Sequence, residues 1–236
     1  MSAEARKVAL VTAAGKGIGE AIARRLAADG WAVATLSPSG RAEALAAELG
    51  GFGVTGSLTE PADLDRLADG ALERFGRIDA VVVNAGHAPK GDLLALADAD
   101  WQAAFELLFL SAVRLIRKAT PALIAAGGGS VVIMSSFAAV EPDETFATSA
   151  AMRGALLNFA KMYADSQAQH GIRINTVLPG FVDSLPEKPG RRERIPLGRY
   201  ARAEEAGALV AFLLSDDAAY LTGQSLRLDG GMIRSP

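Results

Sequence analysis

A short apolar run followed at once by a glycine turn is the feature that most limits how this chain can fold. Residues 8–11 (Val-Ala-Leu-Val) form an uninterrupted apolar run, as in a strand buried on both faces of a parallel sheet. The turn at residues 12–19 (Thr-Ala-Ala-Gly-Lys-Gly-Ile-Gly) follows, and apolar residues then recur at helical spacing as far as Leu26. A helix that begins at Gly17 presents unpaired N–H groups and the positive end of its dipole to an anion. We therefore predict a dinucleotide site, with a plain strand-to-helix turn as the alternative.

Apolar runs alternate with helical patterns through the rest of the chain. This alternation predicts an α/β fold with a doubly wound, mostly parallel sheet and right-handed crossovers. At 236 residues and with one composition throughout, we expect a single domain over residues 1–236. Further strands are expected at 31–36, 52–54, 78–83, 130–134, 172–178 and 225–228. Helices are expected at 41–49, 61–75, about 100–123 and near 204–214, and another runs from the end of the loop 137–146 through Tyr163. Thr59 is the expected N-cap of the helix at 61–75.

The helix expected at about 100–123 differs from the others in pattern. It has apolar residues nearly all round, among them Phe105, Leu108, Phe109 and Ile116. Such a helix is either sandwiched in the core or packed against another subunit.

Composition excludes several classes of function. Charged residues interrupt every apolar run before it reaches membrane-spanning length, so we predict no transmembrane helix. Residues 1–7 lack the apolar core of a secretory signal, which favours the cytoplasm. Without cysteine there is no disulfide, no thiolate nucleophile and no cysteine-based metal centre, and we predict no metal site. A net charge of −3 without a dense basic face argues against nucleic acid as the main partner.

The end of the second strand bears on which dinucleotide binds. An acidic residue there would bind a ribose 2′-hydroxyl and repel a 2′-phosphate, but the chain has Ser37. Lys16, Arg41 and the serine hydroxyls could then hold a phosphate, which favours NADP(H) over NAD(H). The alternative is that residues 37–40 only form a turn that opens the next helix.

Other polar and small residues also follow the ends of strands. The run 84–87 (Asn-Ala-Gly-His) comes after the strand at 78–83, at the carboxyl edge where open α/β sheets bind ligands. The segment 183–200, rich in proline and arginine, is interpreted as a mobile substrate cover. Its arginines Arg191, Arg192 and Arg194 either grip an acidic or phosphate-bearing substrate or belong to a solvated charged loop.

Further motifs stand at Ser135-Ser136, 171–175, Pro179-Gly180, 221–224 and 229–231. Together with 12–19 and Asn84-Ala85-Gly86, they resemble the short-chain dehydrogenase/reductase family over the whole chain. The resemblance implies a seven-stranded Rossmann sheet with helices on both faces, a nicotinamide cofactor, a small-molecule substrate, and homodimers or homotetramers. It also implies that Asn84 contacts the cofactor ribose and that Ser184, at the family's usual threonine position, contacts the nicotinamide amide.

Two cofactor positions depart from the family pattern. The first glycine of the turn is Ala13, which is tolerable if its φ stays below zero. Ser57 stands where the family often has an aspartate near the adenine, so we expect a weaker contact there. The full set of residues expected at the cofactor is Thr12, Gly15, Lys16, Gly17, Ile18, Gly19, Ser37, Arg41, Ser57, Leu58, Asn84, Ala85, Gly86, Pro179, Gly180, Val182 and Ser184.

The catalytic positions depart further. An ungapped count back from Gly171 places the family's tyrosine at Ser149 and its lysine at Arg153, and a count of thirteen forward from Ser136 agrees. Positions i and i+4 share a helix face, so both side chains are expected to point toward the cofactor. A register with a four-residue gap would use Thr145 and Ser149 instead. Neither register restores a tyrosine.

Only Ser136 of the family's four catalytic residues remains, because the asparagine position, seven residues after Trp101, falls on Leu108. An aliphatic hydroxyl starts far above the phenol pKa of about 10, so Ser149 is not expected to act as an acid. It can hydrogen-bond a substrate or position a water. Arg153 is expected to offer a positive charge and a donor fork to the nicotinamide ribose, and Leu108 cannot anchor a relay water.

The proton source therefore has to differ. His87 is the best side-chain candidate, since it follows the turn at the ligand edge and its intrinsic pKa is suitable, with an ordinary loop residue as the alternative. The leading hypothesis is an NADP(H)-dependent oxidoreductase that reduces a carbonyl or an activated alkene with a proton drawn from solvent. The alternatives are a non-catalytic nucleotide-binding subunit or sensor, and a dehydratase or isomerase that does not use its cofactor for redox chemistry.

Overall fold

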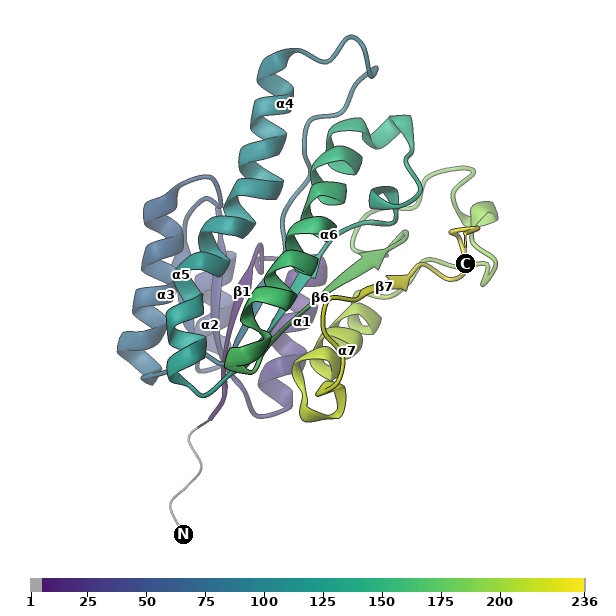
Figure 1. Cartoon of the computed structure of the whole chain (residues 1–236). Helices are drawn as coiled ribbons and strands as arrows, with labels where there is room; N and C mark the ends of the chain where they lie inside the picture. Colours follow the sequence, from purple (N-terminus) through teal and green to yellow (C-terminus); the bar gives the residue numbers. More distant parts are fainter. Residues whose placement is uncertain (1–5, 236) are drawn as a thin grey trace.

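A single parallel sheet of seven strands organises the computed structural model, which describes residues 6–235 (Figure 1). Residues 1–5, on which the expectation about a secretory signal partly rests, and residue 236 lie outside the described part. The strand order is β3-β2-β1-β4-β5-β6-β7, so the predicted doubly wound Rossmann sheet is confirmed. The strands are β1 Val8–Thr12, β2 Ala32–Ser37, β3 Phe52–Thr55, β4 Ala80–Val83, β5 Gly129–Met134, β6 Ile172–Pro179 and β7 Ser225–Leu228.

Helices cover both faces of this sheet. Three of them, α3, α5 and α6, pack over one face, and α1 and α7 pack together over the other (Figure 1). The central strand β1 serves both layers because successive side chains alternate: Leu10 lies in the first cluster, and Ala9 and Val11 lie in the second. The helices are α1 Gly17–Ala28, α2 Arg41–Glu48, α3 Pro61–Phe75, α4 Asp98–Ala104, α5 Ser111–Ala125, α6 Ala147–Gln167 and α7 Ala203–Leu214.

The helix expected at about 100–123 is not regular. A π-helical segment, Phe105–Leu110, separates α4 from α5, and Leu108 lies within it with 2% of its surface exposed. The apolar pattern could not locate this wide turn, because residues that are apolar all round give no helical phase. Leu108 and Ile116 are buried within this chain, as the core interpretation requires.

Two local expectations are wrong. Ala13 has φ +47°, in the left-handed region, because the turn folds back so that the Ala14 N–H donates to Leu36 O of β2 at 3.1 Å. Thr59 is not the N-cap of α3, which is Glu60, because the Thr59 hydroxyl lies 2.8 Å from Ser57 Oγ instead.

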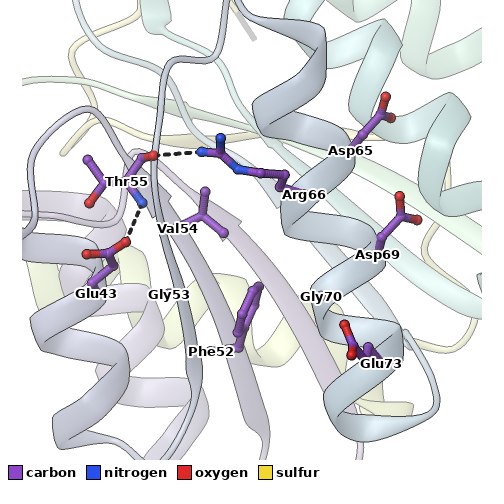
Figure 2. Close-up of a pocket in the computed structure, with 10 residues that line it drawn as sticks. All are labelled: Glu43, Phe52, Gly53, Val54, Thr55, Asp65, Arg66, Asp69, Gly70 and Glu73. Carbon is purple, nitrogen blue, oxygen red and sulfur yellow. Dashed lines mark hydrogen bonds between the residues drawn. The ribbon is translucent and has the colours of Figure 1, made fainter.

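The edge strand β3 is protected on its open side. The Thr55 N–H donates to Glu43 of α2 at 3.0 Å, and Arg66 of α3 donates to Thr55 O at 2.9 Å (Figure 2). A surface pocket of about 500 Å³ lies between these helices, and Phe52 and Gly70 are part of its wall. The side chains therefore satisfy the main-chain groups that an added strand would use. This pocket lies at the flank of the sheet rather than at the carboxyl ends of the central strands, so we do not assign it to the cofactor.

No helix within residues 6–235 is long and apolar enough to span a membrane.

Candidate active site

The glycine turn forms a close-fitting cradle at the start of α1. Gly17 has φ +59°, and a Cβ at this position would lie 2.9 Å from the Cβ of Ser184. The turn therefore touches a segment more than 160 residues away, which places Ser184 against the first turn of α1. Lys16 precedes the helix in extended conformation and makes no side-chain cap. The first N–H groups of α1 are thus left for an anion.

The end of β2 meets the same turn. A Cβ at Gly15 would lie 2.7 Å from Ser37 Oγ and 3.2 Å from the Cβ of Arg41, so these three predicted residues are brought together. Ser37 is buried and its hydroxyl donates to Ser39 O at 2.8 Å. Lys16 and Arg41 are exposed, and within residues 6–235 neither side chain forms an ion pair or a hydrogen bond. Two unneutralised cations therefore flank the place where a ribose phosphate would lie.

The predicted adenine side is built from the loop after β3. The Ser57 N–H donates to Asp63 Oδ2 at 2.7 Å, and Leu58 beside it is buried. A carboxylate is thus present at this loop after all, contributed by the first turn of α3 rather than by the position that the family often uses.

A reciprocal pair of hydrogen bonds joins the ends of β1 and β4. Thr12 Oγ1 donates to Asn84 O at 2.7 Å and accepts from the Asn84 N–H at 2.9 Å. The Asn84 side chain donates to Ala13 O at 3.5 Å. Asn84 is therefore held against the glycine turn, with Ala85, Gly86 and the exposed His87 immediately after it.

Arg153 is the centre of the predicted catalytic region. Only 9% of its surface is exposed, and within the described chain it has no carboxylate partner. Its Nη1 donates to the main-chain carbonyls of Met134 and Ser135 at the end of β5, the latter at 3.0 Å. Its Nε donates to Ser149 Oγ at 3.1 Å. Burial lowers the pKa of Arg153 to about 10, so the guanidinium remains charged at neutral pH.

Ser149 and Ser136 therefore belong to one assembly. Ser149 Oγ accepts from a cation, so its own O–H is left to donate to an acceptor in the site. Ser136 directly follows the carbonyl that Arg153 binds, and its Oγ accepts from the Ala138 N–H at 3.2 Å. Thr145, used by the gapped register, is exposed and precedes α6, so it does not share a helical face with Ser149.

Leu108 and His87 complete the surroundings. Leu108 packs in an apolar cluster beside Met152, the neighbour of Arg153, and so offers no polar group for a relay water. Partial desolvation of the imidazole and the charges of Lys90, Arg153 and Lys16 lower the pKa of His87. Little imidazolium is therefore present at pH 7.

The segment after β6 closes the site. Gly180 donates to Leu228 O at 2.9 Å, and a Cβ there would lie 2.9 Å from the Cα of Asp229. Val182 pairs with Ala201 in a parallel bridge, which closes the loop 183–200 at its base. Tyr200 within this loop is buried and stacks on Phe181, with 5.5 Å between ring centroids. The loop is thus anchored at its base; its mobility stays a prediction.

Comparisons with known proteins show the family to which this fold belongs. A family model described as enoyl-(acyl carrier protein) reductase matches residues 12–233. The 3-oxoacyl-(acyl carrier protein) reductase FabG of Escherichia coli K12 is 34% identical over 236 residues, covering 96% of this chain and 97% of that protein. Oxidoreductase UcpA of Escherichia coli O157:H7 is 36% identical over 248 residues, covering 95% and 94%.

The chain belongs to the short-chain dehydrogenase/reductase family. A solved structure of L-sorbose reductase from Gluconobacter frateurii, in complex with NADPH and L-sorbose, matches with a TM-score of 0.89 and 29% identity over 98% of both chains. A third relative, dehydrogenase/reductase SDR family member 4 of Bos taurus, is 34% identical over 243 residues, covering 96% of this chain and 87% of that protein.

Within this family frame, sequence reasoning missed two features of the site. The first is the binding of Arg153 to main-chain carbonyls, which carry no sequence signal. The second is a group of phenylalanine rings, Phe137, Phe146 and Phe181, contributed by three segments. Two of these rings directly follow the recognised motifs Ser135-Ser136 and Pro179-Gly180, and that adjacency was the available clue.

Proposed function

We propose that the protein is an NADP(H)-dependent oxidoreductase that transfers a hydride between the nicotinamide and a carbonyl or activated alkene, and that the proton comes from water. The observation that carries this proposal is the linked assembly of Ser149, Arg153 and the end of β5. In this assembly the Arg153 guanidinium binds both the Ser149 hydroxyl and the carbonyl of Ser135, the residue before Ser136, which supports a role for both serines at the substrate.

The preference for the phosphorylated cofactor rests on charge. Lys16 and Arg41 lack partners within the described residues and flank the buried Ser37, while the Ser39 hydroxyl remains available as a donor. A 2′-phosphate would neutralise these cations. The NADPH bound in the L-sorbose reductase structure supports this choice.

In the proposed reaction, the nicotinamide supplies the hydride when bound. Ser184 would bind its amide and Asn84 its ribose, which fits their positions against the glycine turn. Ser136 and Ser149 would donate hydrogen bonds to the substrate carbonyl oxygen, and the charge of Arg153 would stabilise the negative charge that develops there. As the hydride bonds to the carbonyl carbon, the C=O π pair moves onto oxygen. That oxygen then takes a proton from water and leaves hydroxide, which the solvent buffers.

A second candidate, a nucleotide-binding subunit without catalysis, is favoured by one observation. The donors of Arg153 bind main-chain carbonyls and Ser149, so the residue in the lysine position also ties α6 to β5. A purely structural role for Arg153 would suit a protein that binds the nucleotide and does not turn over.

The proposal includes a cytoplasmic homodimer or homotetramer. Multi-angle light scattering of the purified protein tests the oligomeric state directly.

Calorimetric titration with NADPH, followed by NADPH oxidation over a carbonyl panel, tests the function. We expect binding and turnover, with turnover reduced in Ser136→Ala and Ser149→Ala. Tight binding without turnover of any substrate, in the wild type as in both variants, would support the binding subunit instead.

A further inference from the structure

Three aromatic rings lie together beside the candidate active site. We call Phe137, Phe146 and Phe181 the aromatic cluster. The centroid of Phe137 lies 5.8 Å from that of Phe146 and 5.6 Å from that of Phe181. Phe137 directly follows Ser136, and Phe146 lies one helical turn before Ser149 in sequence. The cluster therefore borders the place where the substrate carbonyl is proposed to bind.

Three cations, Lys90, Arg191 and Arg194, are held over these rings. The Arg194 guanidinium carbon lies 5.6 Å from the centroid of Phe181 and 5.9 Å from that of Phe137. Lys90 Nζ lies 4.9 Å from the centroid of Phe146, and the Arg191 guanidinium carbon lies 4.6 Å from that of Phe181 and 5.8 Å from that of Phe146. The position of Lys90 is set by its neighbour, because Thr148 Oγ1 donates to Pro89 O at 2.7 Å. Lys90 therefore directly follows Pro89, the residue that Thr148, the neighbour of Ser149, contacts.

Part of the positive charge around the aromatic cluster has no carboxylate partner. Within residues 6–235, none of Lys90, Lys188 and Arg191 forms an ion pair with a carboxylate. Other arginines of the same loop do: Arg192 pairs with Glu187 at 2.7 Å, and Arg194 pairs with Asp143 at 3.1 Å. Of the three arginines in this loop that the sequence suggested for gripping a substrate, only Arg191 therefore keeps its charge available.

These cations also act on one another. Desolvation, followed by the charges of Lys188 and Arg191, lowers the pKa of Lys90. Lys90 and Arg191, held over the same ring of Phe146, repel each other, and a bound oxyanion would relieve that repulsion.

We propose that Lys90 and Arg191 form an anion subsite next to the candidate active site, and that it binds a carboxylate or phosphate group carried by the carbonyl substrate. This inference rests on the proposed function, because it names the class of substrate. The arrangement favours a substrate with its carbonyl at Ser136 and Ser149 and its anionic end over the aromatic cluster.

The test compares matched carbonyl compounds with and without an oxyanion. Levulinate and methyl levulinate form the carboxylate pair, and dihydroxyacetone phosphate and dihydroxyacetone form the phosphate pair. The variants are Lys90→Gln combined with Arg191→Gln, the charge-preserving Arg191→Lys, and the control Arg199→Gln. Arg199 lies in the same loop, is exposed and pairs with Glu205. Circular dichroism and thermal melts confirm that each variant is folded.

We expect NADPH oxidation with the anionic member of at least one pair to show a KM at least about tenfold lower than with its neutral partner. The double variant should remove that difference with kcat changed less than about twofold. Arg191→Lys should retain most of the KM difference between the anionic and the neutral substrate, and Arg199→Gln should retain all of it. Equal KM values within both pairs, or a preference that survives the double variant, would overturn the subsite.

A binding measurement separates this inference from the proposed function. Levulinate or dihydroxyacetone phosphate is titrated by calorimetry into protein saturated with NADP⁺, where the ketone cannot be reduced. If no compound is turned over but an anion still binds and the double variant abolishes its binding, the proposed function fails and the subsite stands. If carbonyl compounds are reduced but neither anion binds better than its neutral partner, the subsite fails and the proposed function stands.

Discussion

Replacing Arg41 by alanine should weaken NADPH binding about tenfold and leave NADH binding unchanged. The Cβ of Arg41 lies 3.2 Å from the place that a Cβ of Gly15 would occupy, at the turn beside the buried Ser37. Its guanidinium is exposed and has no partner within the described residues. The substitution therefore breaks no contact of the free protein, and any loss of affinity reports an interaction with the ligand.

The magnitude follows from Coulomb's law. Two unit charges about 4 Å apart in water attract by about 1 kcal/mol, and a phosphate with close to two negative charges roughly doubles this. Salt screening in 0.15 M buffer reduces the interaction, with a Debye length of about 8 Å. We take about 1.4 kcal/mol for Arg41, which is a factor of about ten in Kd. Lys16→Ala combined with Arg41→Ala should lower NADPH affinity about a hundredfold if the two effects add.

Calorimetric titration with NADPH and NADH at low and high salt measures these affinities. Arg74→Ala is the matched control, since Arg74 is an exposed arginine at the end of α3, where the chain turns toward the start of β4 and so lies away from the carboxyl ends of the strands. The preference for NADPH should shrink as salt rises in the wild type and stay small in the double variant. An equal loss of NADH and NADPH affinity, or a wild-type preference for NADH, would refute the assignment of Lys16 and Arg41 to the 2′-phosphate.

The remaining predictions concern catalysis and stability. Ser149→Ala should lower kcat about a hundredfold without changing NADPH affinity, as measured by steady-state kinetics and calorimetry; an unchanged kcat would exclude Ser149 from the reaction. His87→Gln should keep NADPH oxidation within about twofold of wild type at about pH 7 to pH 8, because the lowered pKa leaves little imidazolium there to donate a proton; a tenfold loss would assign the proton to His87. Burial lowers the pKa of Arg153 to about 10, so the unfolded chain holds this proton to higher pH than the folded protein does. The penalty for burying the charge is therefore fully present at neutral pH and is relieved above pH 10. In urea denaturation, the free energy of unfolding of the wild type should rise by about 1.4 kcal/mol relative to that of Arg153→Met between about pH 9 and pH 11. If the difference in unfolding free energy between the two proteins does not change over this pH range, the pKa of Arg153 is not lowered. Ala13→Gly should raise the free energy of unfolding by about 0.5 kcal/mol, since relief of the positive φ outweighs the added freedom of the unfolded chain; a loss of stability would show that Ala13 is not strained.

The layout of the fold could be predicted because its signals are local. The apolar run of β1 and the glycines of residues 12–19 mark a buried strand that feeds a helix, and the same pattern repeats along the chain. The π-helical turn at Leu108 could not be predicted, since side chains that are apolar on every side do not record a change of helical pitch. The positive φ of Ala13 could not be predicted either, because it results from the contact of the turn with β2.

The sequence indicated which positions to consider for the candidate site, but not the contacts that their side chains make. Counting residues placed Ser149 and Arg153 one helical turn apart, and the structure joins them by a hydrogen bond. The carbonyls that fix Arg153 belong to β5, and sequence patterns do not describe main-chain acceptors. The aromatic cluster brings together rings from three segments, so only the fold reveals that Lys90 and Arg191 share one space.

Transfer of deuterium from C4-deuterated NADPH to a carbonyl substrate tests the central claim most directly. Mass spectrometry of the product alcohol should find one deuterium on the carbinol carbon, formed by a protein with no tyrosine at position 149. NADPH that binds tightly, without label appearing in any product of the carbonyl panel, would contradict the account and identify a protein that holds the cofactor without using it.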